Sequence, residues 1–159
     1  MRIGIISDTH GLLRSEVFTR FAGVDHILHA GDVGPAGLLA ELEAIAPVTA
    51  VWGNTDGFDI RRLVPEIAHV ELGGVRVVVL HGMQLGSPTP AKVAAAHPEA
   101  GLVVFGHSHK AVIQQVGPVL AVNPGSAGPP RFRDPITCAI GTIHDGHISV
   151  ELIELRDAK

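Results

Sequence analysis

The first third of the chain alternates short apolar runs with amphipathic stretches. Three apolar runs predict buried strands, at residues 2–7, 24–30 and 48–52. Apolar side chains four positions apart in residues 13–21 predict a helix after the first run. Pro35 can begin a second helix, which Pro47 ends. The β-α-β-α-β order predicts a parallel arrangement, in which ligands bind beyond the carboxyl ends of the strands.

The rest of the chain is dominated by pairs of apolar runs joined by tight-turn residues. Three such pairs predict β-hairpins, across Gly73-Gly74, Gly117-Pro118 and Asp145-Gly146. Thr89-Pro90 predicts the start of a helix over residues 90–97, and residues 102–105 predict another strand. We therefore expect mostly antiparallel strands here, within an α/β fold of two sheets packed face to face with few helices outside. With no linker or repeat, residues 1–159 are expected to form one domain.

Composition narrows the class of protein. Hydrophobic residues make up 46% of the chain and charged residues 18%, which excludes intrinsic disorder. The net charge is −4 and no run of Lys or Arg is present, so we expect no binding to a long nucleic acid. No apolar stretch is long enough for a membrane span or a signal peptide, which predicts a cytoplasmic protein. The high apolar content predicts a homo-oligomer.

Polar residues of a few chemical types follow five of the predicted strands. The five motifs are Asp8-Thr9-His10, Gly31-Asp32, Gly53-Asn54, His81-Gly82 and Gly106-His107-Ser108-His109. Residues two apart on an extended segment point to the same side, so each Asp-x-His or His-x-His pair can serve one site. Each motif alone is weak, but together they place Asp and His side chains beside a core, where they need partners or a metal.

The chemistry of these ligands indicates the kind of ion. Oxygen and nitrogen donors without a thiolate suit manganese, iron, zinc, nickel or cobalt better than calcium or magnesium. Seven side chains are too many for one tetrahedral zinc and suit two ions that share a bridging carboxylate. Two divalent ions serve phosphoryl chemistry, because they bind phosphate oxygens and lower the pKa of a bridging water. Manganese is the expected metal, with the other four as alternatives.

The ordered motifs resemble those of the calcineurin-like metallophosphoesterases, most closely their small YfcE-like phosphodiesterase branch. The resemblance extends from Arg2 to about Arg133. It implies a four-layer αββα sandwich of two mixed β-sheets flanked by helices. It also implies hydrolysis of a small phosphoester, most directly a phosphodiester, by a hydroxide bridging two metal ions. The ligand roles that it implies are one ion on Asp8, His10 and His109, the other on Asn54, His81 and His107, and Asp32 between them.

Further positions affect the expected chemistry. Thr55 follows Asn54, where many members of the wider family carry a histidine that helps to protonate the leaving group. Asn54 is the expected catalytic residue, and Asp56 is an alternative proton donor. Asn123, in a segment that resembles a loop of the branch, and Arg131 beyond it are expected to bind substrate. A turn followed by a solvated arginine is the alternative interpretation.

A non-catalytic scaffold for protein interactions is the alternative function, since the retromer subunit with this fold is of that kind. A scaffold has no need of a full ligand set, whereas this chain retains all seven residues, which favours the enzyme. His29, just before Gly31-Asp32, is interpreted as a packed strand residue, with contact to Asp32 as the alternative.

Overall fold

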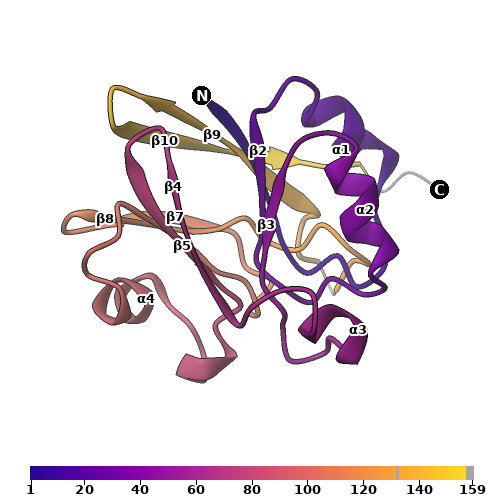
Figure 1. Ribbon diagram of the computed structural model, residues 1–159. Helices are drawn as coiled ribbons and strands as arrows, with labels where there is room; N and C mark the ends of the chain where they lie inside the picture. Colours follow the sequence, from indigo (N-terminus) through magenta and orange to yellow (C-terminus); the bar gives the residue numbers. More distant parts are fainter. Residues whose placement is uncertain (132, 157–159) are drawn as a thin grey trace.

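The computed structural model describes residues 1–131 and 133–156, which form two five-stranded sheets (Figure 1). The expected domain runs to residue 159, and residues 157–159 lie outside the described part. The first sheet has the strand order β10-β9-β1-β2-β3. Its strands are β1 (Arg2–Ile6), β2 (His26–His29), β3 (Val48–Ala50), β9 (Thr137–His144) and β10 (His147–Glu154). β1, β2 and β3 are parallel, and β9 pairs with β1 in the antiparallel sense.

The second sheet has the strand order β4-β5-β6-β8-β7. Its strands are β4 (Ile67–Leu72), β5 (Val75–Leu80), β6 (Leu102–Val104), β7 (Val112–Val116) and β8 (Val119–Asn123). The expectation of mostly antiparallel strands is wrong for its centre, because β5, β6 and β8 are parallel. Helix α4 (Pro90–Ala96) links β5 to β6, and β7 lies at the edge, so that β8 returns beside β6.

The three predicted hairpins are confirmed. β4 pairs with β5, β7 with β8 and β9 with β10, all antiparallel. In the first of these turns Gly73 and Gly74 have φ of 55° and 82°, and in the last Asp145 and Gly146 have φ of 50° and 75°. Two consecutive positive φ angles match the right-handed twist of the paired strands, which explains the residue types at these turns.

Helices cover the outer faces of both sheets, which gives the four layers (Figure 1). Helices α1 (Ser15–Arg20) and α2 (Gly37–Glu43) bury Val17 and Leu42 against the first sheet. α4 buries Val93 against Val78 and Val103 of the second sheet. Thr89 caps α4, because its hydroxyl accepts a hydrogen bond from Lys92 N at 3.2 Å.

Apolar side chains of both sheets interdigitate between them. Ile3, Ile5 and Leu28 of the first sheet pack in one cluster with Val79 and Val104 of the second. Fully burying one such side chain stabilises the fold by about 1.5–3 kcal/mol. The two sheets are therefore held as one unit, and residues at the ends of their central strands keep a fixed spacing.

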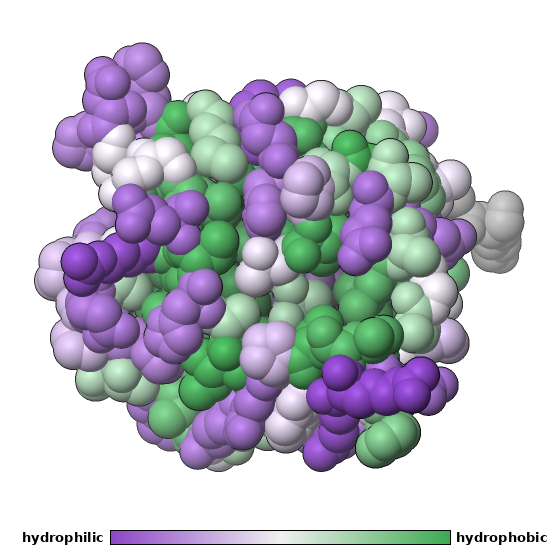
Figure 2. All heavy atoms as spheres, viewed as in Figure 1, coloured by the Kyte–Doolittle hydropathy of each residue, from purple (hydrophilic) through white to green (hydrophobic). Residues whose placement is uncertain are grey.

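Two short helices near the strand ends were not predicted. They are α3 (Phe58–Arg61) and a 3-10 turn, η1 (Met83–Leu85). On the surface, hydrophobic residues are interspersed with hydrophilic ones (Figure 2). Phe58 and Leu63 are the most exposed large hydrophobic side chains among the described residues. Within residues 1–131 and 133–156, every helix is too short or too polar to cross a membrane.

Candidate metal centre

Seven polar side chains meet at one edge of the molecule, where five strands end. They follow β1, β2 and β3 of the first sheet and β5 and β6 of the second. Within each sheet these strands are parallel, so their carboxyl ends lie at the same edge. The structure brings together all the side chains predicted as metal ligands, which are Asp8, His10, Asp32, Asn54, His81, His107 and His109.

The backbone at most of these residues is in the left-handed conformation. Six non-glycine residues of the described chain have a positive φ. Five of them are in the cluster: Asp8 (55°), His10 (46°), Asp32 (53°), His107 (71°) and His109 (62°). This conformation costs a non-glycine residue about 1–3 kcal/mol, and it persists only where neighbouring contacts hold it. Such strain is typical of functional sites.

Asp8, His10 and His109 form the first half of the cluster. Asp8 Oδ1 lies 3.2 Å from His109 Nε2 and 3.7 Å from His10 Nε2. The two imidazole nitrogens lie 3.4 Å apart. One ligand atom from each of the three residues lies within 4.8 Å of the others.

Asn54, His81 and His107 form the second half. His107 Nδ1 lies 3.1 Å from Asn54 Oδ1 and 3.3 Å from His81 Nε2. Asp32 Oδ2 connects the two halves, because it lies 3.2 Å from His81 Nε2 and 3.8 Å from His10 Nε2. Asp32 therefore lies between the two groups, and its role as a bridging ligand stays a prediction.

Hydrogen bonds fix the direction in which His81, Asp8 and Asp32 point. His81 Nδ1 donates to the carbonyl of Ala30 at 2.8 Å, which leaves Nε2 for the cluster. Asp8 Oδ2 accepts from Ser7 Oγ at 2.7 Å, and Asp32 Oδ1 accepts from Thr55 N at 3.0 Å. Each carboxylate thus has one oxygen held by the protein and the other directed at the imidazoles.

The environment of the cluster shifts the pKa values of Asp32, His81 and His107. Burial by itself raises the pKa of Asp32, but the hydrogen bond and charge of His81 and the N–H of Thr55 hold it well below its usual range. Burial by itself lowers the pKa of His81, but Asp32 and Asp8 raise it overall. Burial, assisted by the charge of His81, lowers the pKa of His107. Asp32 therefore stays ionised at neutral pH, as a metal ligand must be.

The cluster fits divalent cations. Asp8 Oδ1 and His109 Nδ1 are buried without a hydrogen-bond partner, and an unpaired buried carboxylate oxygen is costly. Two ligand atoms about 2.1 Å from one ion lie about 3.0 Å apart at a right angle and about 3.4 Å apart at a tetrahedral angle. The Asp8–His109 and His10–His109 distances, 3.2 and 3.4 Å, fall in this range. A cation would satisfy the carboxylate oxygen and relieve the crowding of the nitrogen atoms around it.

His29 ties together two of the loops that carry ligands. Its Nδ1 accepts from Gly31 N at 3.1 Å, so its Nε2 carries the proton and donates to Thr9 Oγ1 at 3.0 Å. Thr9 Oγ1 in turn donates to the carbonyl of Val33 at 2.8 Å. His29 is thus both a packed strand residue and a link between the loops after β1 and β2. The sequence signal for it was its place two residues before a ligand motif.

Two residues with predicted roles at the substrate are buried. Asn123 is completely buried, and its amide donates to the carbonyl of Gly106 at 3.1 Å and accepts from Gly125 N at 2.9 Å. Direct contact between Asn123 and substrate does not fit this structure, in which the side chain instead holds the loop after β6. Asp56 is 5% exposed and both its oxygens accept backbone N–H groups. Neither oxygen is therefore free to protonate a leaving group.

Arg131 and Thr55 lie on the surface. Arg131 is exposed, in a turn where its carbonyl accepts from Asp134 N at 3.1 Å. Its contact with substrate stays a prediction. The side chain of Thr55 is exposed directly after Asn54, so this position is accessible to a substrate held at the cluster.

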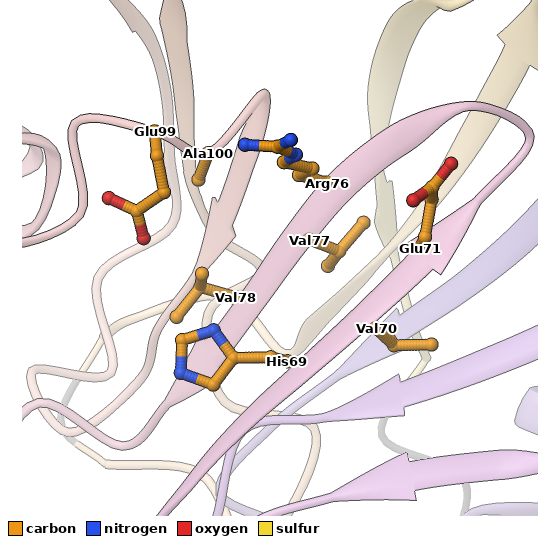
Figure 3. Close-up of a pocket in the computed structure, with 8 residues that line it drawn as sticks. All are labelled: His69, Val70, Glu71, Arg76, Val77, Val78, Glu99 and Ala100. Carbon is orange, nitrogen blue, oxygen red and sulfur yellow. The ribbon is translucent and has the colours of Figure 1, made fainter.

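A separate cavity of about 240 Å³ lies over β4 and β5 (Figure 3). Its lining includes His69, Arg76 and Glu99, and none of the predicted metal ligands. Charged groups of both signs and valines share this surface, and the described buried polar atoms without a partner lie in the ligand cluster instead. The cluster, and not the cavity, is therefore the candidate site.

Comparison with known proteins shows similarity along most of the chain. The calcineurin-like phosphoesterase superfamily domain matches residues 1–146. A probable metallophosphoesterase of Methanothermobacter thermautotrophicus is 35% identical over 143 residues, which cover 85% of this chain and 82% of that protein. A phosphodiesterase of Methanocaldococcus jannaschii is 28% identical over 142 residues, which cover 79% of this chain and 83% of that protein.

Solved structures show the same fold. An archaeal phosphodiesterase superposes with a TM-score of 0.77 at 25% identity, covering 96% of this chain and all of the other. Wild-type Vps29 of Entamoeba histolytica in complex with Zn²⁺ superposes with a TM-score of 0.77 at 22% identity, covering 97% of this chain and 99% of the other.

Proposed function

Because this chain belongs to the calcineurin-like phosphoesterase superfamily, we propose that it hydrolyses small phosphoesters, most directly phosphodiesters, with two divalent metal ions. The observation that carries the proposal is the convergence of seven polar side chains, among them Asp8, whose buried Oδ1 has no hydrogen-bond partner. Family membership gives the reaction class, and the geometry of the cluster supports a dinuclear centre.

The distances support one assignment of ligands. Asp8, His10 and His109 would hold one ion, and His81, with Asn54 and His107, would hold the other. Asp32 would bridge them, since its Oδ2 lies within 3.8 Å of an imidazole nitrogen from each half. Two such ions would supply a hydroxide nucleophile near neutral pH and neutralise charge on the phosphoryl oxygens.

The side chains of the protein contribute binding and orientation. The Nδ1–H of His81 donates to Ala30 O, and this keeps Nε2 directed into the site. Asn54 is exposed and its Oδ1 faces His107, so its amide nitrogen is the group that we propose to contact a phosphoryl oxygen. This contact would make Asn54 the catalytic residue of the chain, in addition to its place as a ligand.

The donor set supports a transition metal as the cofactor. Four imidazoles, two carboxylates and one amide oxygen suit manganese, nickel, iron, zinc or cobalt. We propose manganese as the native ion. Expression of the protein in medium supplied with each ion, followed by elemental analysis of the purified chain, would separate these alternatives.

A protein-interaction scaffold is the alternative function, and the likeness in fold to Vps29 favours it. The two functions make opposite predictions for hydrolysis. A scaffold would bind metal and still leave phosphodiesters intact, whereas the proposed enzyme would cleave them in proportion to the metal bound.

His81→Ala tests the proposal. Loss of this imidazole should lower the metal content from about two ions to about one per chain and reduce hydrolysis of an aryl phosphodiester about a hundredfold or more, because a direct ligand is removed. His144→Ala is the matched control, since the His144 side chain is 88% exposed at the end of β9, next to the hairpin turn. Equal activity of His81→Ala and His144→Ala would contradict the proposal.

A further inference from the structure

The loops that follow β2 and β3 meet with almost no space between their backbones. A Cβ atom on Gly53 would overlap both the backbone nitrogen and Oδ1 of Asp32. A Cβ atom on Gly31 would lie 3.0 Å from Gly53 N and 2.8 Å from His81 Nδ1. Glycine at these positions lets the loop of Asp32 and the loop of Asn54 approach each other this closely.

One carboxylate joins these two loops. Asp56 Oδ2 accepts from Val33 N at 3.1 Å and from Gly53 N at 2.9 Å, and Oδ1 accepts from Gly34 N at 3.0 Å. The side chain is 5% exposed, so these charge-assisted bonds are shielded from water. Two of the donors lie after β2 and the third lies after β3, which makes the carboxylate a bridge between segments about twenty residues apart in sequence.

Two of the three residues that Asp56 holds are direct neighbours of predicted ligands. Val33 follows Asp32, and Gly53 precedes Asn54. The carbonyl of Asp56 is itself fixed by Arg61 Nε at 2.8 Å, and the Arg61 guanidinium lies 4.1 Å from the Trp52 ring centre.

We infer that Asp56 is a positioning residue, which sets the distance between Asp32 and Asn54 and thereby the spacing of the two metal ions. The inference rests on the proposed function, because it assigns these two residues to a shared metal centre. Asp56 touches neither substrate nor metal in this account. It acts by holding Asp32 in its left-handed conformation, at φ 53°, against the loop after β3.

Asp56→Asn is the direct test, with Asp59→Asn as the control. Asparagine has nearly the same size, but its amide nitrogen cannot accept a hydrogen bond, so at least one of the three N–H groups loses its partner. Asp59 is exposed in the neighbouring helix α3, three residues further along the chain, and its substitution removes the same charge. Binding of Mn²⁺ is measured by calorimetry well below the unfolding temperature of each variant. We expect Mn²⁺ to bind Asp56→Asn about 10–100-fold more weakly than the unaltered chain, and Asp59→Asn unchanged.

A second measurement uses the unaltered chain. If the hydrogen bonds to Asp56 strengthen metal binding, metal binding must stabilise these hydrogen bonds by the same factor. Addition of Zn²⁺, which is diamagnetic, should therefore slow hydrogen exchange at the amides of Val33, Gly34 and Gly53. This measurement does not depend on activity, and it tests the role of Asp56 even if Asp56→Asn fails to fold.

The outcomes separate this inference from the proposed function. If the unaltered chain binds two ions and Asp56→Asn binds them as tightly, the inference alone is overturned. Exchange at the three amides that is fast and insensitive to metal would overturn it as well. A chain that binds no metal would overturn the proposed function together with the inference.

Discussion

Thr55 stands at the exposed edge of the ligand cluster, directly after Asn54. Its backbone N–H holds Asp32, so the position is fixed relative to the site. Its hydroxyl is far too weak an acid to protonate a departing oxygen near neutral pH. With Asp56 engaged by three backbone donors, the two residues after Asn54 offer no proton for the leaving group.

The lack of a proton donor after Asn54 predicts that the rate of hydrolysis depends strongly on the leaving group. Nitrophenyl diesters should be cleaved well, because a nitrophenolate leaves unprotonated, and alkyl esters much more slowly. General acid help is typically worth about a hundred- to ten-thousand-fold in rate. Thr55→His should narrow the difference between the two substrates, and Thr55→Asn, which adds no acid, should not. Both substrates are measured with all three proteins at saturating metal. Equal rates of the natural chain on both esters would contradict the argument.

At the residue scale, the sequence predicts candidate site residues where a polar side chain directly follows a strand. The places of Asp8 and His81 beside the other predicted ligands follow from the sequence, because each polar side chain directly follows an apolar run at a strand end. The positions of Asn123 and Asp56 could not be predicted, because their partners come from other segments. Asn123 donates a hydrogen bond to the carbonyl of Gly106, and Asp56 accepts one from Val33 N. Only the folded chain shows that these side chains are buried and hold loops together.

At the scale of elements, the ends of β1, β2 and β3 lie in close contact at the site. Their loops pack backbone against backbone, and the sequence places glycine at the closest approaches, Gly31, Gly34 and Gly53. The hairpins were predictable because their turns have a local signature. The parallel pairing of β5, β6 and β8 was not, because parallel strands are joined by long connections that leave no such signature. Helix α3, with four residues, is too short for a periodic pattern.

Gly53→Ala tests this view of the loops. The added Cβ would overlap Asp32, so the loops must separate, and such overpacking typically destabilises a protein by about 1–3 kcal/mol. Activity and metal affinity should fall together with stability. Gly57→Ala is the control, because a Cβ on Gly57 meets no atom within 4 Å. Urea unfolding and Mn²⁺ titration of the two variants provide the measurement. Equal stability and metal affinity of Gly53→Ala and Gly57→Ala would show that the close approach of Gly53 to Asp32 affects neither property.

At the scale of the whole molecule, the buried interior also contains a titratable group. His29 is completely buried, and burial lowers its pKa to about 4, although the charges of Asp8 and Asp56 act in the opposite direction. In the unfolded chain the pKa returns to an ordinary value near 6.5. Between these two values the unfolded state binds more protons than the folded state, so stability falls as the pH falls from about 6.5 to about 4.

The predicted acid sensitivity can be measured on metal-free protein. A pKa lowered from 6.5 to about 4 corresponds to about 3 kcal/mol lost over that pH range. His29→Gln removes the titration, so its deficit in stability relative to the natural chain should shrink as the pH falls. His144→Gln, at an exposed position, should show a constant difference. Urea unfolding in a chelating buffer at several pH values gives these differences. A deficit of His29→Gln that stays constant with pH would show that His29 does not titrate in this way.

The overall architecture was the most predictable feature, since two face-to-face sheets with outer helices follow from the alternation of apolar and polar residues. The self-association predicted from composition stays a prediction, with Phe58 and Leu63 as its most exposed apolar side chains.

Metal dependence of hydrolysis is the central claim, and one titration tests it most directly. Metal-free protein is titrated with Mn²⁺ while the hydrolysis of bis(4-nitrophenyl) phosphate is followed. We expect a negligible rate without metal, a rise that ends near two ions per chain, and loss of activity when a chelator is added. Full activity without metal, or no hydrolysis with two ions bound, would contradict it.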